Sequence, residues 1–160
     1  MDVVYQTFDD DAIKTVTDAT WSFFIMQFPA QKKAIMTTFV GTEGSEYSIS
    51  SLFSTSAPQN LNGVYEPEYR WNLQDIDMQP VAGHEWKSAA SGETYYTKYK
   101  INLAGDHPAD LTVTMAWDDQ EVEVENRFVY EGLGHVTGTL DGEVVNGTAW
   151  LEMQPVGTLN

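Results

Sequence analysis

The sequence predicts an all-β domain, a barrel or a sandwich, on three observations. Apolar and polar residues alternate in short segments such as Glu121–Val124, a period typical of strands with one buried face. Turn-forming Gly, Asp, Asn and Pro residues separate these segments at short spacing. No long segment has a helical period, and strands do not alternate with helices. Together these observations predict about eight to ten antiparallel strands in one domain over residues 1–160.

The first two strands are predicted as a hairpin. Residues 20–28 are mostly apolar and end at Pro29, and residues 33–40 follow after a short connection. The remaining segments are assigned in the same way. Further strands are predicted at 46–53, 69–76, 94–103, 111–117, 121–130, 135–140 and 143–153, with a polar loop at 54–63, a long connection at 77–92 and one short helix at 10–18.

Asp141-Gly142 gives the strongest local signal. The pair lies between two β-rich segments, and both residue types tolerate the positive φ angles of a type I′ turn. We therefore predict a two-residue hairpin loop at this point.

Composition excludes several function classes. The chain has 24 acidic and 8 basic residues, a net charge of −16, which disfavours binding to nucleic acid or anionic membranes. It contains no Cys, so disulfides, thiolate metal sites and a thiol nucleophile are excluded. No membrane span and no signal peptide are recognisable. We expect a cytoplasmic protein, with secretion left open in case a signal peptide has been removed.

Four short motifs share an order and spacing with a known family. They are Trp86-x-Ser88-x-x-Ser91-Gly92-x-x-Tyr95, Asp119-Gln120-Glu121, Tyr130-Glu131-Gly132 and Gly147-x-x-Trp150-x-Glu152. Over residues 18–153 the chain resembles the hydroxyneurosporene synthase (carotenoid 1,2-hydratase) family. Members of that family usually carry two lipocalin-like barrels in tandem, and this chain resembles the second one alone. The resemblance implies a single lipocalin-like (calycin-like) β-barrel.

The resemblance also implies a function. Relatives include carotenoid and isoflavonoid hydratases and fungal Diels–Alder cyclases, which share apolar substrates. We therefore expect an enzyme without a cofactor that cyclises or isomerises an apolar polyketide or isoprenoid intermediate, with hydration as the next choice. A carrier barrel for a hydrophobic small molecule is the alternative. A third interpretation is a structural half that forms a homodimer or pairs with a separate first-barrel protein.

The candidate catalytic residues are Glu131, Glu152 and Tyr99. The resemblance selects the two glutamates, and a carboxylic acid whose pKa is raised in a dry barrel would protonate an alkene. Alternatively, each glutamate closes the barrel structurally by pairing with Arg127 or Lys98. A tyrosine hydroxyl such as that of Tyr99 would polarise the substrate.

The candidate substrate-binding residues are mainly aromatic, since such rings stack on polyenes and stabilise cations. Strand alternation allows only one of Tyr95 and Tyr96 to face a cavity. His84 and His107 are expected in solvated turns, and the histidine spacing predicts no metal site. The substrate-binding set is Trp21, Trp86, Trp117, Trp150, Tyr96 and His135.

Overall fold

The secondary structure of the described chain consists of strands. The computed structural model describes residues 20–42, 45–54, 70–73, 76–124 and 127–154, so the helix predicted at 10–18 lies outside the described residues. Within these ranges no helix is long and apolar enough to cross a membrane. The strands are β1 (Thr20–Phe28), β2 (Lys33–Thr42), β3 (Ser45–Ser54), β4 (Arg70–Leu73), β5 (Ile76–Pro80), β6 (Glu85–Lys87), β7 (Thr94–Tyr96), β8 (Lys98–Leu103), β9 (Ala109–Met115), β10 (Glu121–Val124), β11 (Arg127–Leu140) and β12 (Glu143–Gln154).

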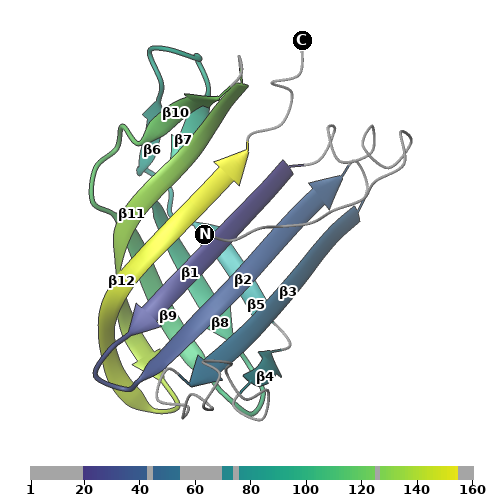
Figure 1. The fold of residues 1–160 in the computed structure, drawn as a ribbon, viewed down its shortest axis with the longest axis vertical. Helices are drawn as coiled ribbons and strands as arrows, with labels where there is room; N and C mark the ends of the chain where they lie inside the picture. The colour runs from purple at the N-terminus through teal and green to yellow at the C-terminus, as the bar shows by residue number, and fades with distance from the viewer. Residues whose placement is uncertain (1–19, 43–44, 55–69, 74–75, 125–126, 155–160) are drawn as a thin grey trace, which may run out of the picture.

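Ten of these strands form one antiparallel sheet. Its order is β4-β3-β2-β1-β12-β11-β9-β8-β5, and β10 is attached to β11. The sheet coils so that β1, β2 and β3 lie across from β8 and β9 (Figure 1). The two edge strands are consecutive in sequence, and Leu73 and Ile76 are close enough in the chain that their Cα atoms lie within about 11 Å. The result is a nearly closed barrel, which confirms the predicted fold class.

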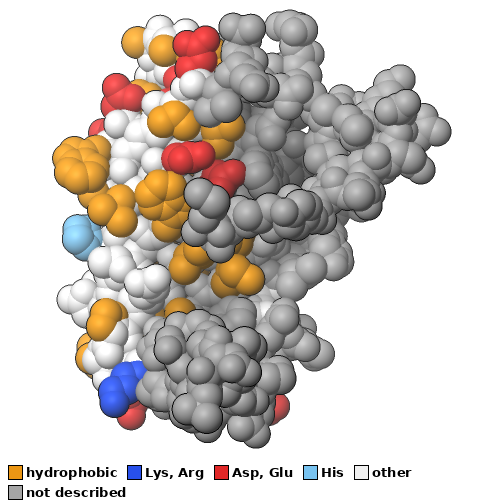
Figure 2. Space-filling model, in the orientation of Figure 1, with side chains coloured by type: hydrophobic (Ala, Val, Ile, Leu, Met, Phe, Trp, Pro, Cys, Tyr) orange, Lys and Arg blue, Asp and Glu red, His pale blue; other side chains and the backbone are white. Residues whose placement is uncertain are grey.

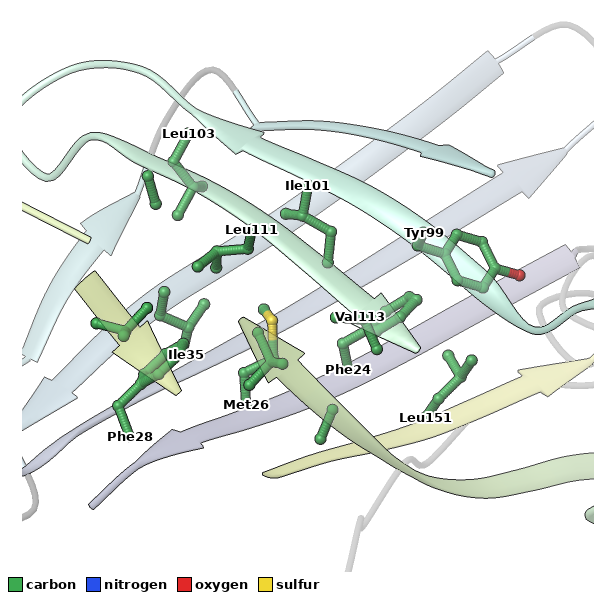
Figure 3. Packing of buried hydrophobic residues seen from close by; sticks show 14 of the residues in the cluster. Phe24, Met26, Phe28, Ile35, Tyr99, Ile101, Leu103, Leu111, Val113 and Leu151 are labelled. Atoms are coloured by element: carbon green, nitrogen blue, oxygen red, sulfur yellow. The ribbon is translucent and has the colours of Figure 1, made fainter. Parts of the chain in front are cut away.

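Alternating side chains fill the barrel interior. In β9 the burial alternates regularly, with Leu111 and Val113 fully buried between more exposed neighbours. The Thr37 and Ser50 hydroxyls lie 2.5 Å apart on paired positions of β2 and β3, so two buried polar groups satisfy each other. Figure 3 shows part of this packing, which includes Met26, Phe28, Ile35, Ile101, Leu103, Leu111 and Val113.

Strand β11 is longer than the sequence predicts. Residues 131–134 were expected to interrupt it, because they contain Gly132 and Gly134, but the strand runs through both. At Gly132 an added Cβ would collide with the ring of Tyr130, so the missing side chain makes room for that ring inside the barrel. The glycines therefore accommodate close packing and do not form a turn.

Three other predicted boundaries are wrong. The segment predicted as one strand over 94–103 divides into β7 and β8, which belong to different sheets. The segment predicted over 121–130 is split between β10 and β11, which pair with each other antiparallel. The connection predicted over 77–92 contains most of β5 and all of β6. Continuous β-propensity does not show where a strand folds back or changes sheet, because those steps depend on contacts distant in sequence.

The Asp141-Gly142 hairpin is confirmed and anchors one end of the barrel, called here the lower end. The two residues have φ angles of 54° and 79°, as a type I′ turn requires. The Asp141 carboxylate accepts hydrogen bonds from Lys33 Nζ at 2.5 Å and from His107 Nδ1 at 3.1 Å. His107 was expected to be solvated, but its side chain is only 23% exposed. Burial opposes ionisation of Asp141, but these two partners outweigh it and hold its pKa below the ordinary value.

We predict that Asp141→Asn lowers the free energy of unfolding at pH 7 by about 1 kcal/mol. Asparagine supports the same turn, so the change isolates the charge. The folded-state pKa of Asp141 is depressed, so its contribution is complete above the unfolded pKa of about 3.9 and is lost as pH falls through the lower folded value. Urea unfolding should therefore separate variant and wild type at pH 7 and bring them together near pH 2.

Asp110→Asn is the matched control, because its ion pair with Lys100 spans 3.6 Å between exposed side chains. An equal loss in both variants would contradict a specific role for Asp141.

Candidate functional site

Aromatic rings gather at the barrel end that carries the β6–β7 hairpin, called here the aromatic end. Trp86 stacks on its cross-strand partner Tyr95 with ring centroids 5.9 Å apart. The ring of Tyr130 lies close to both, 5.1 Å from Tyr95 and 6.4 Å from Trp86. Tyr96 and Trp86 both pack against the core from the small hairpin sheet. Four aromatic side chains, Trp86, Tyr95, Tyr96 and Tyr130, therefore gather at this end of the barrel.

Tyr99 occupies the interior of the aromatic end. Its ring meets Phe24 edge-on at 5.3 Å and Tyr96 at 6.4 Å, and its side chain is 4% exposed. Its hydroxyl donates to the thioether sulfur of Met153 at 2.8 Å, and sulfur is a weak acceptor. Burial, with smaller contributions from Tyr130 and Tyr96, raises the pKa of Tyr99 above its ordinary value, so the hydroxyl stays protonated. Tyr99 thus presents a buried donor without a strong acceptor (Figure 3).

The other two buried tyrosines use their hydroxyls in the fold. Tyr130 donates to the Trp117 carbonyl at 3.1 Å and accepts from Gln120 Nε2 at 3.3 Å. Burial raises the pKa of Tyr130 to about 12, although the bond from Gln120 acts in the opposite direction. Tyr95 donates to Glu121 at 2.7 Å. Of these three hydroxyls, only that of Tyr99 lacks an oxygen acceptor among the described residues.

The sequence named Tyr95 and Tyr96 as mutually exclusive, and this prediction is wrong. Tyr95 is 2% exposed, and Tyr96 also packs against the core. The alternation rule assumes one continuous strand, whereas the chain leaves the β6–β7 sheet after Tyr96 and enters the main sheet at Lys98. Two neighbouring tyrosines at the end of one short strand therefore both contact the core.

Two residues of the Asp119-Gln120-Glu121 motif have clear partners that the sequence did not assign. The Gln120 amide donates to the carbonyls of Trp117 and Leu133 and accepts from the Leu133 backbone N–H at 2.8 Å. Glu121 accepts hydrogen bonds from two serines and from Tyr95. The sequence analysis recognised both the motif that contains Ser88, Ser91 and Tyr95 and the motif that contains Glu121. Their spacing in the sequence does not show that the two motifs contact each other.

Glu131 and Glu152 lie on the outer face of the barrel. They are direct partners in the β11–β12 ladder, whereas the interior receives the neighbouring Gly132 and Leu151. We expected a carboxylic acid inside the barrel, but both carboxylates lie on its outer face, so the expected location is wrong. Burial, and then repulsion from Glu131, raises the pKa of Glu152. Among the described residues neither carboxylate forms an ion pair, and the side chain of Arg127 lies outside them. Their catalytic role stays a prediction.

Trp150, Trp117 and His135 also point away from the interior. Trp150 is 39% exposed and faces Leu133 across the ladder, and His135 is exposed on the same outer side. Trp117, which is 64% exposed, follows β9 in a turn, so it does not line the barrel. Figure 2 shows hydrophobic side chains beside acidic ones on this face. The side chain of Trp21 lies outside the described residues, and so Trp86, Tyr96 and Tyr99 are the predicted residues that the fold brings together.

Two solved structures resemble this chain. Kievitone hydratase from Nectria haematococca superposes with a TM-score of 0.66 at 19% identity over 84% of this chain, and an AttH candidate from Nitrosomonas europaea with 0.59 at 20% over 86%. They share this fold. The chain spans only 39% of the length of each. No protein-family model and no curated protein sequence matches it.

Metal binding finds no support in the described residues. They contain no group of three or more His, Asp or Glu side chains arranged to hold an ion. What the described residues do assemble is the aromatic end with its buried phenol.

We predict that Glu131→Gln raises the free energy of unfolding at pH 7 by about 0.5 kcal/mol, because like charges directly opposite in a ladder repel. The folded-state pKa of Glu152 is raised, so the folded state is penalised as pH rises through that range, and removing Glu131 relieves part of this penalty. The gain should disappear at pH 3, below the ordinary glutamate pKa of about 4.3. Urea unfolding at both pH values measures it.

Glu143→Gln is the control, because Glu143 is exposed on β12 and is paired with Leu140. A loss of stability in Glu131→Gln at pH 7 would show that a cation holds this carboxylate and would refute the repulsion.

Proposed function

We propose that this chain is an enzyme that acts without a cofactor on an apolar polyketide or isoprenoid intermediate. Cyclisation or isomerisation is the favoured reaction class, and hydration is the next. The observation that carries the proposal is the Tyr99 hydroxyl, a buried donor whose partner in the described structure is a thioether. A donor with no strong acceptor of its own is available to a substrate oxygen.

The surroundings of Tyr99 suit this chemistry. Phe24 and Tyr96 supply ring faces and edges against which an unsaturated chain would pack. The low exposure of the site excludes water, which strengthens a hydrogen bond to a carbonyl or a developing oxyanion. Because the pKa of Tyr99 is raised, the residue acts as a donor and not as a base. A pericyclic or isomerisation step needs shape and such a donor, and no redox cofactor.

Similarity of fold supports the choice of an enzyme over a carrier, without selecting cyclisation. The solved structure from Nectria haematococca is a kievitone hydratase, an enzyme built on this barrel architecture. The outward position of Glu131 and Glu152 favours Tyr99 over these carboxyls as the polarising group, which lowers the weight of alkene protonation and hence of hydration.

A carrier of a hydrophobic small molecule is the second candidate. It would use the same aromatic enclosure but would require no directed donor. The apolar interior, where Phe28 and Leu111 are fully buried, suits an apolar ligand as well as a substrate. Turnover distinguishes the two candidates, since a carrier binds its ligand and leaves it unchanged.

We predict that Tyr99→Phe lowers kcat by about 100-fold and leaves ligand affinity within a few-fold, because the ring is kept and only the donor is lost. Kievitone and a panel of prenylated and polyene compounds would serve as probes, with binding followed by tryptophan fluorescence and turnover by mass spectrometry. Wild-type kcat should not fall between pH 7 and pH 9 through Tyr99, since its raised pKa keeps the hydroxyl protonated.

Tyr130→Phe is the matched control. Its hydroxyl bonds within the fold, so its loss should lower stability and leave kcat close to wild type. Full turnover by Tyr99→Phe would exclude Tyr99 from the reaction, whereas binding without turnover by wild type across the panel would favour the carrier.

The outer face of β11 and β12 supports a proposal about partners. Exposed Leu133 and Trp150 lie beside the Glu131–Glu152 pair, so a surface with an apolar centre and a basic residue would complement it. A two-fold homodimer through this face would place acidic patches against each other. We therefore propose pairing with a separate barrel protein, in keeping with the greater length of the two similar structures.

We predict that the isolated chain is a monomer by light scattering at micromolar concentration, since its own surface does not complement the acidic patch. A dimer that Trp150→Glu dissociates, while the exposed control Val144→Glu does not, would assign this face to self-association and refute the separate partner.

A further inference from the structure

The β6–β7 hairpin is a two-stranded sheet separate from the barrel. It consists of Glu85–Lys87 and Thr94–Tyr96, joined by a six-residue loop. A two-stranded hairpin of this length is marginal in water, so contacts outside it must fix its position. The stacked pair Trp86–Tyr95 supplies an apolar contact with Tyr130. A polar contact is supplied by Glu121 of β10.

Glu121 gathers three hydroxyl donors from the hairpin. Ser88 donates to its Oε2 at 2.6 Å, and Ser91 and Tyr95 donate to its Oε1 at 2.5 Å and 2.7 Å. Hydrogen bonds to an ionised carboxylate are stronger than neutral ones. One side chain of β10 thereby joins the loop of the hairpin to its second strand. These four residues are called here the hydroxyl cluster.

Both serines also organise the loop itself. The Ser88 Oγ accepts from the backbone N–H groups of Ala90 and Ser91, and the Ser91 Oγ accepts from Glu93 N–H at 3.1 Å. Each hydroxyl therefore accepts from its own loop and donates to Glu121, and such chained bonds reinforce one another. The orientation of the loop thus depends on the carboxylate.

The hairpin leads directly to Tyr99. Tyr96 is the last residue of β7, and β8 begins at Lys98, so one residue separates the small sheet from the barrel. The ring of Tyr96 lies 6.4 Å from that of Tyr99. At this junction the Thr97 N–H donates to the His84 carbonyl, and its own carbonyl accepts from Met115 N–H. A shift of the hairpin would therefore move Tyr96 relative to Tyr99.

We propose that Glu121 is a positioning residue, whose hydroxyl cluster fixes the β6–β7 hairpin at the aromatic end and thereby sets the Tyr96–Tyr99 ring pair. That this pair meets a substrate rests on the proposed function; the positioning itself does not. The Trp-x-Ser-x-x-Ser-Gly-x-x-Tyr and Asp-Gln-Glu motifs lie far apart in the sequence, and together they supply the donors and the acceptor of the hydroxyl cluster.

The first test compares Glu121→Ala with Glu123→Ala by amide hydrogen exchange of the whole chain. Glu123 is an exposed side chain two residues further along β10, with no hydrogen bond among the described residues. The N–H groups of Ser88 and Gly92 bond within the loop, and we expect them to exchange at least about tenfold faster in Glu121→Ala only. The Val136 amide in β11 should be unchanged. If the loop amides of Glu121→Ala exchange at the same rate as in wild type, the inference is overturned.

The second test reads the ring pair directly. In protein labelled with ¹³C-tyrosine, Tyr96→Phe and Tyr99→Phe assign the two ring resonances. We expect both to shift in Glu121→Ala and neither to shift in Glu123→Ala. A loosened hairpin with unshifted rings would limit Glu121 to local stability and would overturn the positioning role.

Glu121→Gln provides a graded variant, because its amide oxygen can still accept from Ser91 and Tyr95. It should lie between wild type and Glu121→Ala in both measurements. If Glu121→Ala does not fold, Ser91→Ala removes one donor and gives the same direction of change. With kievitone as the probe, Glu121→Ala should lower kcat by about tenfold and change KM little. No turnover by wild type of kievitone or of any compound in the panel would refute the proposed function, whereas amide exchange and ring shifts would still decide the positioning role.

Discussion

The register of β11 against β12 is the constraint on which the rest of this structure depends. A slip of one residue in an antiparallel pair exchanges the buried and the exposed faces. The Asp141-Gly142 turn fixes this register, and Lys33 and His107 hold the turn from two other parts of the chain. Tyr130 and Met153 face inward as a result, and Glu131 and Glu152 face outward. The acceptor of the Tyr99 hydroxyl is thus set by a turn at the opposite end of the barrel.

The two ends of the barrel have different physical characters. The lower end carries the ion-paired Asp141-Gly142 turn beside buried apolar side chains. Near the aromatic end lie the buried phenols and a small hairpin that is not part of the main sheet. Under the proposed function, the chemistry would take place at the aromatic end, away from the ion-paired turn.

The family-like motifs acquire a physical meaning in this arrangement. Gln120, next to β10, bonds to the backbone of Leu133 in β11. Glu121 accepts hydrogen bonds from the serine hydroxyls of the hairpin loop. Gly132 leaves space for the Tyr130 ring. The motifs thus hold together the part of the fold in which Tyr99 lies. The solved structures with this fold share only 19–20% identity with the chain.

By itself the sequence determined the all-β class, the β1–β2 hairpin and the Asp141-Gly142 turn, because alternation and turn chemistry act over a few residues. It also selected Tyr96 and Tyr99, whose rings meet, and Trp86, which packs against the core from the same small sheet as Tyr96. Only the tertiary structure decided which face of each strand is inside, where residues 94–103 change sheet, and that Glu121 meets Ser88 and Ser91. The buried positions of β11 include Gly132 and Gly134, which give no apolar signal in the sequence, so the buried face of this strand becomes clear only from its pairing with β12 and β9.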